Sequence, residues 1–172
     1  MLLLIQYTLI FASVLALVAL GGCFSEHSGV INIGLEGIMV MGALGGALAM
    51  KFVPAGVPAI VMFLLVVLAS LLMGVLFSLL LGVAAINFNA DQTLVGTALN
   101  LMGTAAAVVI VRAINVAENP DNVSSTIVYR KAKQVFLVNI GDFEFNWFML
   151  IVVLVLIAAH IVLYKTRFGL RL

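Results

Sequence analysis

Long apolar runs separated by short polar stretches make up most of this sequence. A helix needs about 20 predominantly apolar residues to cross the hydrocarbon core of a bilayer. Segments of about this length predict about five membrane-spanning helices, at Leu2–Leu20, Val30–Met50, Val57–Ile86, Leu94–Val111 and Trp147–Tyr164. The third is the strongest, because no charged residue occurs between Lys51 and Asp91. The pattern therefore predicts an all-α integral membrane protein.

The last two apolar segments enclose one sizeable polar region, Arg112–Asn146. Within it, Thr126–Tyr129 and Val135–Ile140 are rich in Val, Ile, Phe and Tyr, which favours a small extramembrane β-hairpin near residues 126–140. No internal repeat divides the chain. We expect a single membrane domain over residues 1–172, with residues 112–146 as an external loop.

The distribution of basic residues indicates an orientation. Lys165, Arg167 and Arg171 directly follow the last apolar segment, and the excess of Lys and Arg on cytoplasmic loops places this end in the cytoplasm. The polar loop has basic residues of its own, but its length and its balancing acidic residues weaken their influence. The C-terminal end is therefore predicted to be cytoplasmic, and the orientation of the N-terminal end stays open.

Composition and charge support the membrane assignment. The chain has 172 residues, of which 65% are hydrophobic and 9% are charged, whereas soluble domains carry about 25% charged residues. Most of the surface must therefore face lipid. The formal net charge of +1 leaves no basic face for nucleic acid. Cys23 follows a hydrophobic segment, as in a lipoprotein signal peptide, but the first basic residue is Lys51 and such peptides open with positive charge.

A glycine-rich polar segment, Gly21–Gly37, joins the first two apolar segments and predicts a broken helix. Irregular backbone is tolerated at membrane depth only where it is buried in protein or lines a cavity. A carboxylate facing lipid would be costly. Asn32 and Glu36 therefore either cap and pack a helix start or face a substrate path. Gly42 and Gly46 form a small-xxx-small pair suited to close helix packing.

A second polar set lies at the start of the fourth apolar segment. Asp91 stands where a carboxylate would cap free backbone N–H groups. Thr97, Asn100 and Thr104 follow at spacings of three and four, so they share one helix face. A polar stripe inside an apolar helix must meet a partner helix or a cavity. For Asp91, capping of the helix is the favoured interpretation. For the stripe, packing against a partner helix and lining of a cavity are the two alternatives.

No chemistry for catalysis is visible in the sequence. His27 and His160 are far apart in sequence and lack ligand-like companions. No nucleophile–base pair, Walker sequence or phosphate-binding glycine loop occurs. We therefore predict that the chain is not an enzyme and holds neither a metal nor a cofactor.

Three segments resemble those of bacterial ABC importer permeases of the nucleoside and simple-sugar family, which also includes ribose and branched-chain amino acid permeases. Ser25–Met39 is similar to the family pattern S-E-R-S-G-V-x-N-I-G-x-E-G, with His27 where arginine is common. Ala90–Leu101 resembles the segment that opens a later span. Tyr164–Leu172 resembles the start of the cytoplasmic coupling region. The N-I-G-x-E-G form favours the nucleoside branch.

The resemblance implies a permease subunit that forms the translocation pathway for nucleosides or simple sugars in the bacterial cytoplasmic (inner) membrane. Its expected partners are a second permease subunit or a second copy, ATP-binding cassette subunits that hydrolyse ATP, and an extracytoplasmic substrate-binding lipoprotein. Since family members are about twice as long, the chain is interpreted as the N-terminal part of a permease. The alternative function is a small self-contained helical channel or scaffold.

The resemblance also implies site residues. Five polar residues are expected along the translocation pathway: Asn32, Glu36, Asp91, Thr97 and Asn100. Coupling to the ATPase subunit is expected at Phe168, Gly169, Leu170 and Arg171. In this interpretation Phe168 and Leu170 are apolar anchors, Gly169 is a flexible joint and Arg171 supplies charge.

Overall fold

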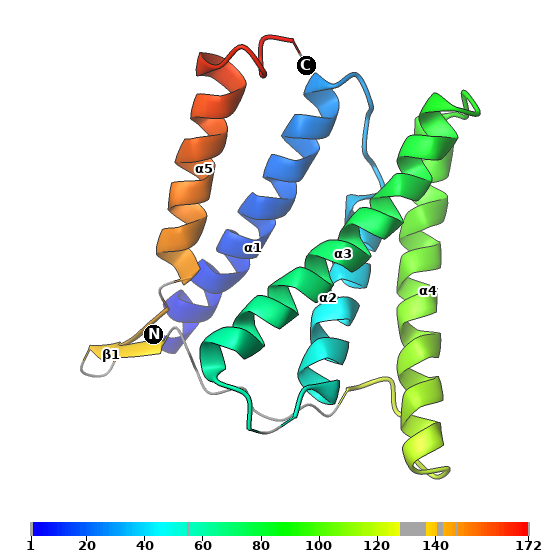
Figure 1. Ribbon diagram of the computed structural model, residues 1–172, viewed down its shortest axis with the longest axis vertical. Helices are drawn as coiled ribbons and strands as arrows, with labels where there is room; N and C mark the ends of the chain where they lie inside the picture. Colours follow the sequence, from blue (N-terminus) through cyan, green and yellow to red (C-terminus); the bar gives the residue numbers. More distant parts are fainter. Residues whose placement is uncertain (1, 55, 128–136, 141–142, 147, 172) are drawn as a thin grey trace. The chain divides into compact units, whose positions relative to one another are not determined.

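The fold consists of five helices and one hairpin. The computed structural model describes residues 2–54, 56–127, 137–140, 143–146 and 148–171. In these ranges lie the helices α1 (Leu2–His27), α2 (Leu35–Phe52), α3 (Ala59–Ile86), α4 (Gln92–Glu118) and α5 (Phe148–Lys165) (Figure 1). Each is long and apolar enough to cross a membrane. The expected all-α membrane fold with about five spans is confirmed.

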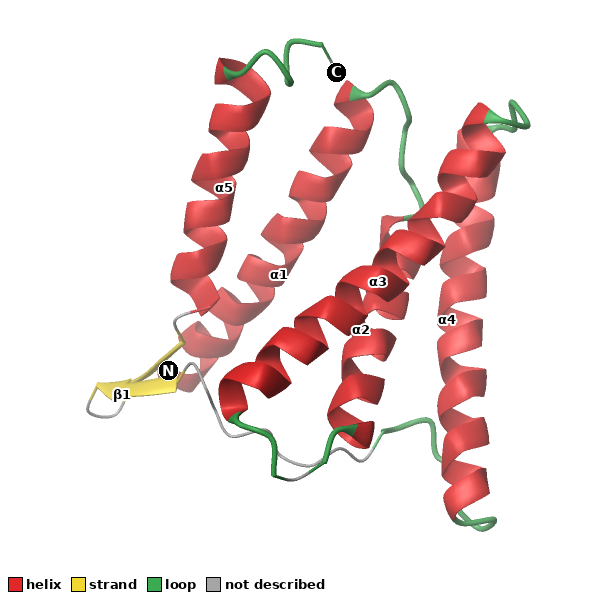
Figure 2. Cartoon of the chain, in the orientation of Figure 1, coloured by secondary structure: helices red, strands yellow, loops and turns green. Residues whose placement is uncertain are grey.

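The described strands, β1 (Leu137–Ile140) and β2 (Phe143–Asn146), pair antiparallel in a hairpin (Figure 2). The hairpin expected near residues 126–140 thus lies further along the chain. Thr126 and Ile127 are not in a strand, and residues 128–136 lie outside the described residues. The dipeptide Gly141-Asp142 would have predicted the position of the hairpin more accurately. It lies between the two strand sequences and is typical of two-residue hairpin loops.

Two helix boundaries differ from those expected. α4 continues past Arg112 to Glu118, so residues 112–118 are helical and do not belong to the loop. The helix ends there because Asn119 precedes Pro120, which disfavours the helical conformation, and the backbone of Asn119 is extended. α1 runs to His27, so the break predicted within residues 21–37 is narrowed to Ser28–Gly34.

The helices form two compact units. The first contains α1, the hairpin and α5. α1 and α5 pack side by side and run in the same direction (Figure 1). Near their C-terminal ends the ring of His27 meets the ring of Tyr164 edge-on, with centroids 6.1 Å apart. His160 lies one turn earlier on α5, with its ring centroid 5.0 Å from that of Tyr164.

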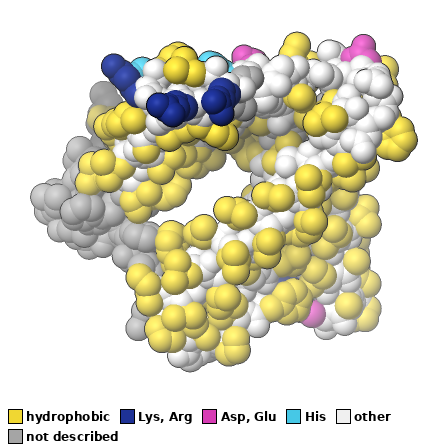
Figure 3. Space-filling model, turned by 45° about the horizontal axis from the view of Figure 1, so that its top comes forward, with side chains coloured by type: hydrophobic (Ala, Val, Ile, Leu, Met, Phe, Trp, Pro, Cys, Tyr) yellow, Lys and Arg dark blue, Asp and Glu magenta, His cyan; other side chains and the backbone are white. Residues whose placement is uncertain are grey.

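The second unit contains α2, α3 and α4, with α2 packed against both of the others. Its core combines side chains from all three helices: Met41, Leu44, Phe77, Leu81, Leu99 and Val111. The outward faces remain apolar, and α3 exposes Leu64, Leu68 and Leu72 along its length. Hydrophobic side chains cover the helix sides in Figure 3. This surface is what a lipid environment requires.

α2 and α3 approach closely through glycines. A Cβ atom at Gly45 would lie 2.8 Å from the backbone oxygen of Ala69, closer than real Cβ contacts. Gly42 and Gly46, the predicted small-xxx-small pair, both face Ser70 of α3, and a Cβ at Gly46 would clash with its hydroxyl. The predicted role of this pair in helix packing is confirmed.

Candidate functional site

The start of α2 lies against the first half of α4, along a contact that consists largely of backbone. A Cβ at Gly37 would lie 2.5 Å from the backbone oxygen of Leu99, and one at Gly103 would lie 2.9 Å from the Cα of Gly37. A Cβ at Gly96 would lie 3.0 Å from the backbone nitrogen of Gly34. We call these four glycines, Gly34, Gly37, Gly96 and Gly103, the glycine seam. Larger residues here would force the two segments apart.

Asn100 lies within the glycine seam and bonds to the opposing backbone with both ends of its amide. Its Nδ2 donates to the backbone oxygen of Ile33 at 2.9 Å. Its Oδ1 accepts from the backbone nitrogen of Gly37 at 2.7 Å. The Gly37 N–H belongs to the first turn of α2, where backbone donors have no partner within the helix. Asn100 therefore both caps α2 and holds the chain that leads into it.

The other members of the polar stripe are satisfied within α4. The hydroxyl of Thr97 donates to the backbone oxygens of Thr93 and Leu94, at 3.0 and 2.9 Å. The hydroxyl of Thr104 donates to the backbone oxygen of Asn100 at 2.9 Å. Of the three residues predicted to share a polar face, Asn100 is the one that bonds to another segment, so packing explains its place in the stripe.

Asp91 is the N-cap of α4. Its Oδ1 accepts from the backbone nitrogens of Thr93 and Leu94, at 2.8 and 3.1 Å. A carboxylate at a helix N-terminus also interacts favourably with the helix dipole. The capping interpretation of Asp91 is confirmed, and its side chain is exposed.

Asn32 and Glu36 differ from the other candidates, because within the described part of the chain neither the Asn32 Oδ1 nor the Glu36 carboxylate has a hydrogen-bond partner. The Oδ1 of Asn32 is buried. Glu36 lies in the first turn of α2 and is exposed, and the N-cap residue Gly34 supplies no side-chain cap. An unpaired buried acceptor costs about 1–3 kcal/mol, so the position of Asn32 has a cost that local folding does not explain.

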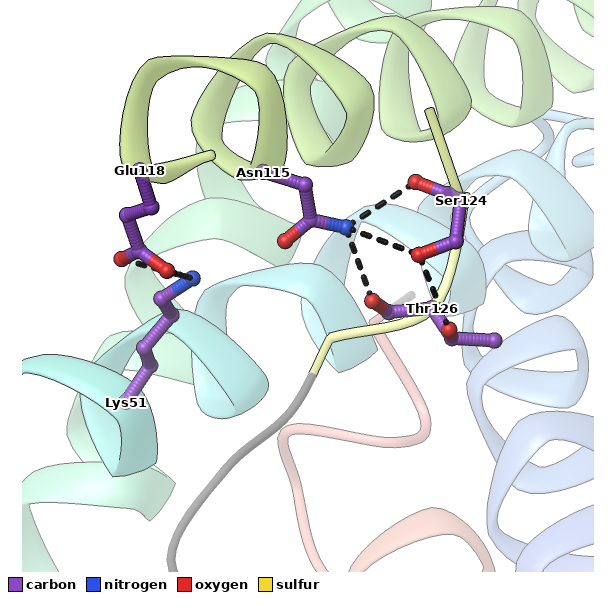
Figure 4. Close-up of polar contacts among 5 residues, drawn as sticks. All are labelled: Lys51, Asn115, Glu118, Ser124 and Thr126. Carbon is purple, nitrogen blue, oxygen red and sulfur yellow. Dashed lines mark hydrogen bonds and ion pairs between the residues drawn. The ribbon is translucent and has the colours of Figure 1, made fainter. Parts of the chain in front are cut away.

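At the ends of α2 and α4 that lie away from the glycine seam, several polar side chains form contacts that the sequence analysis missed (Figure 4). Lys51 donates to Glu118, and the amide of Asn115 donates to the backbone oxygens of Ser124 and Thr126, both at 2.9 Å. Asn115 is only 2% exposed. The sequence signal for this was Pro120. A helix predicted to end just before this proline would have included Asn115 and Glu118.

The residues predicted to couple to an ATPase form a turn directly after α5. Phe168 is 62% exposed and Leu170 is 79% exposed, so both are available as anchors. At Gly169 a Cβ would clash with the backbone of Leu163, so the turn as folded requires glycine there. The turn is closed by a hydrogen bond from the Leu170 nitrogen to the Thr166 backbone oxygen at 3.3 Å. Lys and Arg side chains gather at this end of the unit (Figure 3).

Residues 4–172 match a family model described as "Branched-chain amino acid transport system / permease component". The chain is 38% identical over 169 residues to the guanosine ABC transporter permease protein NupQ of Bacillus subtilis, covering 96% of this chain and 53% of the relative. It is 36% identical over 168 residues to the nucleoside ABC transporter permease protein NupC of Lactococcus lactis, covering 95% of this chain and 52% of the relative.

A shorter match of 57% identity over 35 residues, 20% of this chain and 11% of the relative, joins it to the putative glucose ABC transporter permease protein TsgC13 of Haloferax volcanii. No solved structure matches. The chain spans about half the length of the first two relatives. Because the family model covers nearly all of it, the chain belongs to the permease components of the branched-chain amino acid transport system family.

Proposed function

We propose that this chain forms part of the translocation pathway of an ATP-driven importer for nucleosides in the bacterial cytoplasmic membrane. The observation that carries the proposal is the identity of 36–38% over 95–96% of the chain to permeases whose names specify guanosine and nucleosides. The glucose permease matches over 35 residues only, so nucleosides are favoured over simple sugars. Family membership favours a permease over a self-contained channel or scaffold.

The proposed mechanism is alternating access. The permease presents a cavity to one side of the membrane at a time, and a nucleotide cycle in ATP-binding cassette subunits shifts the balance between the two states. The exposed Phe168 and Leu170 would dock those subunits on the cytoplasmic side. A second permease or a second copy would complete the pathway, and an extracytoplasmic lipoprotein would deliver substrate.

Asn32 and Glu36 are the proposed substrate contacts within this chain. A nucleoside carries ribose hydroxyls and base N–H groups, and all of these can donate to an amide oxygen or a carboxylate. The fold already occupies the polar groups of Asp91, Thr97 and Asn100. Within the described part of the chain, the Asn32 Oδ1 is buried without a hydrogen-bond partner, and the Glu36 side chain is exposed. Both lie beside the glycine seam, at the break between helices.

Uptake measurements in the complete transporter test this proposal. Radiolabelled guanosine is supplied to cells that lack other nucleoside permeases, and Glu36→Gln and Asn32→Ala are compared with the unmodified protein. Glu36→Gln keeps an acceptor but loses the charge, and hydrogen bonds to charged groups contribute about 1–1.5 kcal/mol more than neutral ones, so KM should rise about five- to tenfold. Asp121→Asn is the matched control, because it removes an exposed carboxylate from the loop beyond α4.

Two results would contradict the proposal in different ways. Unchanged uptake in both variants would remove Asn32 and Glu36 from the pathway. Uptake of simple sugars or branched-chain amino acids, without any uptake of nucleosides, would overturn the substrate class.

A further inference from the structure

The two proposed substrate contacts lie on either side of the point where an irregular segment enters α2. Residues 28–34 are not helical, and α2 begins at Leu35. Asn32 precedes this start and Glu36 follows it. Their relative placement therefore depends on how the chain turns into α2, and something outside the segment must hold that turn.

Asn100 brackets this segment. It bonds to the backbone oxygen of Ile33, directly after Asn32, and to the backbone nitrogen of Gly37, directly after Glu36. Two side-chain hydrogen bonds from α4 reach the backbone of residues 33 and 37. One planar amide thus fixes two backbone groups four residues apart.

In the glycine seam the two backbones lie close together, which makes the link through the Asn100 side chain short and rigid. With no Cβ at Gly37 or Gly103, the backbones of α2 and α4 touch, and the Cα of Asn100 would lie 3.0 Å from a Cβ placed at Gly37. A short side chain can therefore reach across. Small shifts of α4 are passed directly to residues 33–37, because close-packed segments have little room to yield.

Direct substrate binding by Asn100 is disfavoured by the same geometry. Both ends of its amide are engaged, at 2.9 and 2.7 Å. Releasing either bond to bind a ligand would leave a backbone group without its partner, at a cost of about 1–3 kcal/mol if that group stays buried. A substrate donor or acceptor would have to compensate that loss before contributing any affinity.

We infer that Asn100 is a positioning residue for substrate recognition: it holds Asn32 and Glu36 in their relative geometry through Ile33 and Gly37 and does not itself contact the substrate. The inference rests on the proposed function of Asn32 and Glu36. In this inference α4 helps to shape the substrate site, although none of its side chains contacts the substrate.

The kinetic test compares Asn100→Asp with Thr104→Val in the complete transporter. Asn100→Asp keeps an acceptor for the Gly37 N–H but loses the donor to Ile33. Thr104→Val removes a hydroxyl from the same helix face whose bond stays within α4. We expect Asn100→Asp to raise KM about two- to tenfold, as for one lost hydrogen bond, with the maximal rate per folded transporter unchanged. Thr104→Val should change neither.

Substrate analogues separate positioning from contact. Across guanosine, inosine and 2′-deoxyguanosine, the loss of affinity in Asn100→Asp should follow the pattern seen in Glu36→Gln and Asn32→Ala, because Asn100 acts through those two residues. A loss confined to substrates that carry a group to which Glu36→Gln and Asn32→Ala are both insensitive would show that Asn100 touches that group and would overturn the inference. Combined with Glu36→Gln, Asn100→Asp should add less than its separate effect, since residues that act together are not additive. Full additivity would count against it.

A second measurement does not depend on the substrate. The variant Glu36→Cys, in a Cys23→Ser background, is labelled with a soluble maleimide with and without Asn100→Asp. The labelling rate should change several-fold with Asn100→Asp and stay constant with Thr104→Val. A constant rate in both would overturn the positioning role even if no nucleoside is transported. A changed rate without nucleoside uptake would leave the positioning role supported and contradict the proposed function alone.

Discussion

Lys51 and Glu118 join the ends of α2 and α4 that lie away from Asn100, with the Lys51 Nζ 2.9 Å from each oxygen of the Glu118 carboxylate. The two residues differ in burial: the side chain of Lys51 is 9% exposed and that of Glu118 is 59% exposed. α2 and α4 are therefore held together at both ends, by an amide near the start of α2 and by an ion pair at its end.

The unequal burial predicts unequal effects of mutation. Glu118→Gln leaves a buried ammonium without its counter-charge and should lower the free energy of unfolding by about 1–3 kcal/mol. Lys51→Met leaves a mostly exposed carboxylate and keeps the apolar stem, so its effect should stay under about 1 kcal/mol. Thermal unfolding in detergent measures both. The double variant should resemble Lys51→Met, and a larger effect of Lys51→Met than of Glu118→Gln would contradict this account.

The glycine seam predicts a site-specific cost for adding one methyl group. Gly37→Ala would place its Cβ 2.5 Å from the Leu99 backbone oxygen, and such overpacking costs about 1–3 kcal/mol. Gly82→Ala in α3 is the matched control, because a Cβ there meets nothing within 4 Å. Melting temperatures of the two variants give the comparison. Equal temperatures would show that α2 and α4 do not touch at Gly37.

The cap at Asp91 predicts that its acceptor matters more than its charge. Asp91→Asn preserves an N-cap acceptor, so both stability and uptake should remain close to those of the unmodified protein. Asp91→Ala removes the cap and should cost about 1 kcal/mol of stability, without altering KM. Reduced uptake by Asp91→Asn at an unchanged protein level would instead place the carboxylate in the pathway.

The exposed turn after α5 predicts a contact with the ATPase subunit. Truncation of an aromatic anchor costs about 2 kcal/mol or more, roughly thirtyfold in affinity. Phe168→Ala should therefore weaken pull-down of the ATPase subunit and lower uptake, with membrane insertion unchanged. Arg171→Lys, which keeps the charge, should do less damage. Wild-type pull-down and uptake by Phe168→Ala would leave the basic residues acting through charge alone.

The number of spans also predicts on which side of the membrane α1 begins. If the turn after α5 is cytoplasmic, five crossings place the N-terminal end of α1 and the loop after α4 outside. An impermeant thiol reagent on intact cells should label a cysteine placed at Ser125 and spare one placed at Leu170. The background is Cys23→Ser, because Cys23 is exposed. The reverse labelling would invert this topology.

The sequence by itself determined the number and type of the spans and predicted the cap at Asp91. Both depend on neighbours in the chain: a lipid solvent requires about 20 apolar residues in a row, and an N-cap bonds to nitrogens two and three residues away. The predicted end of α4 was less accurate. Arg112 interrupts the apolar run, but the helix continues until just before Pro120. An exposed arginine on a helix can extend its charged group to water, so it need not end the helix.

The tertiary structure decided which polar side chains meet. Asn100 bonds to residues 63 and 67 positions away, and Lys51 bonds to one 67 positions away. The spacing of Thr97, Asn100 and Thr104 placed them on one face, but spacing is the same whether a side chain bonds within its helix or across to another. That choice depends on the distance between the two backbones. It is short at Asn100 because glycines of two helices face each other there, and this register is a property of their packing.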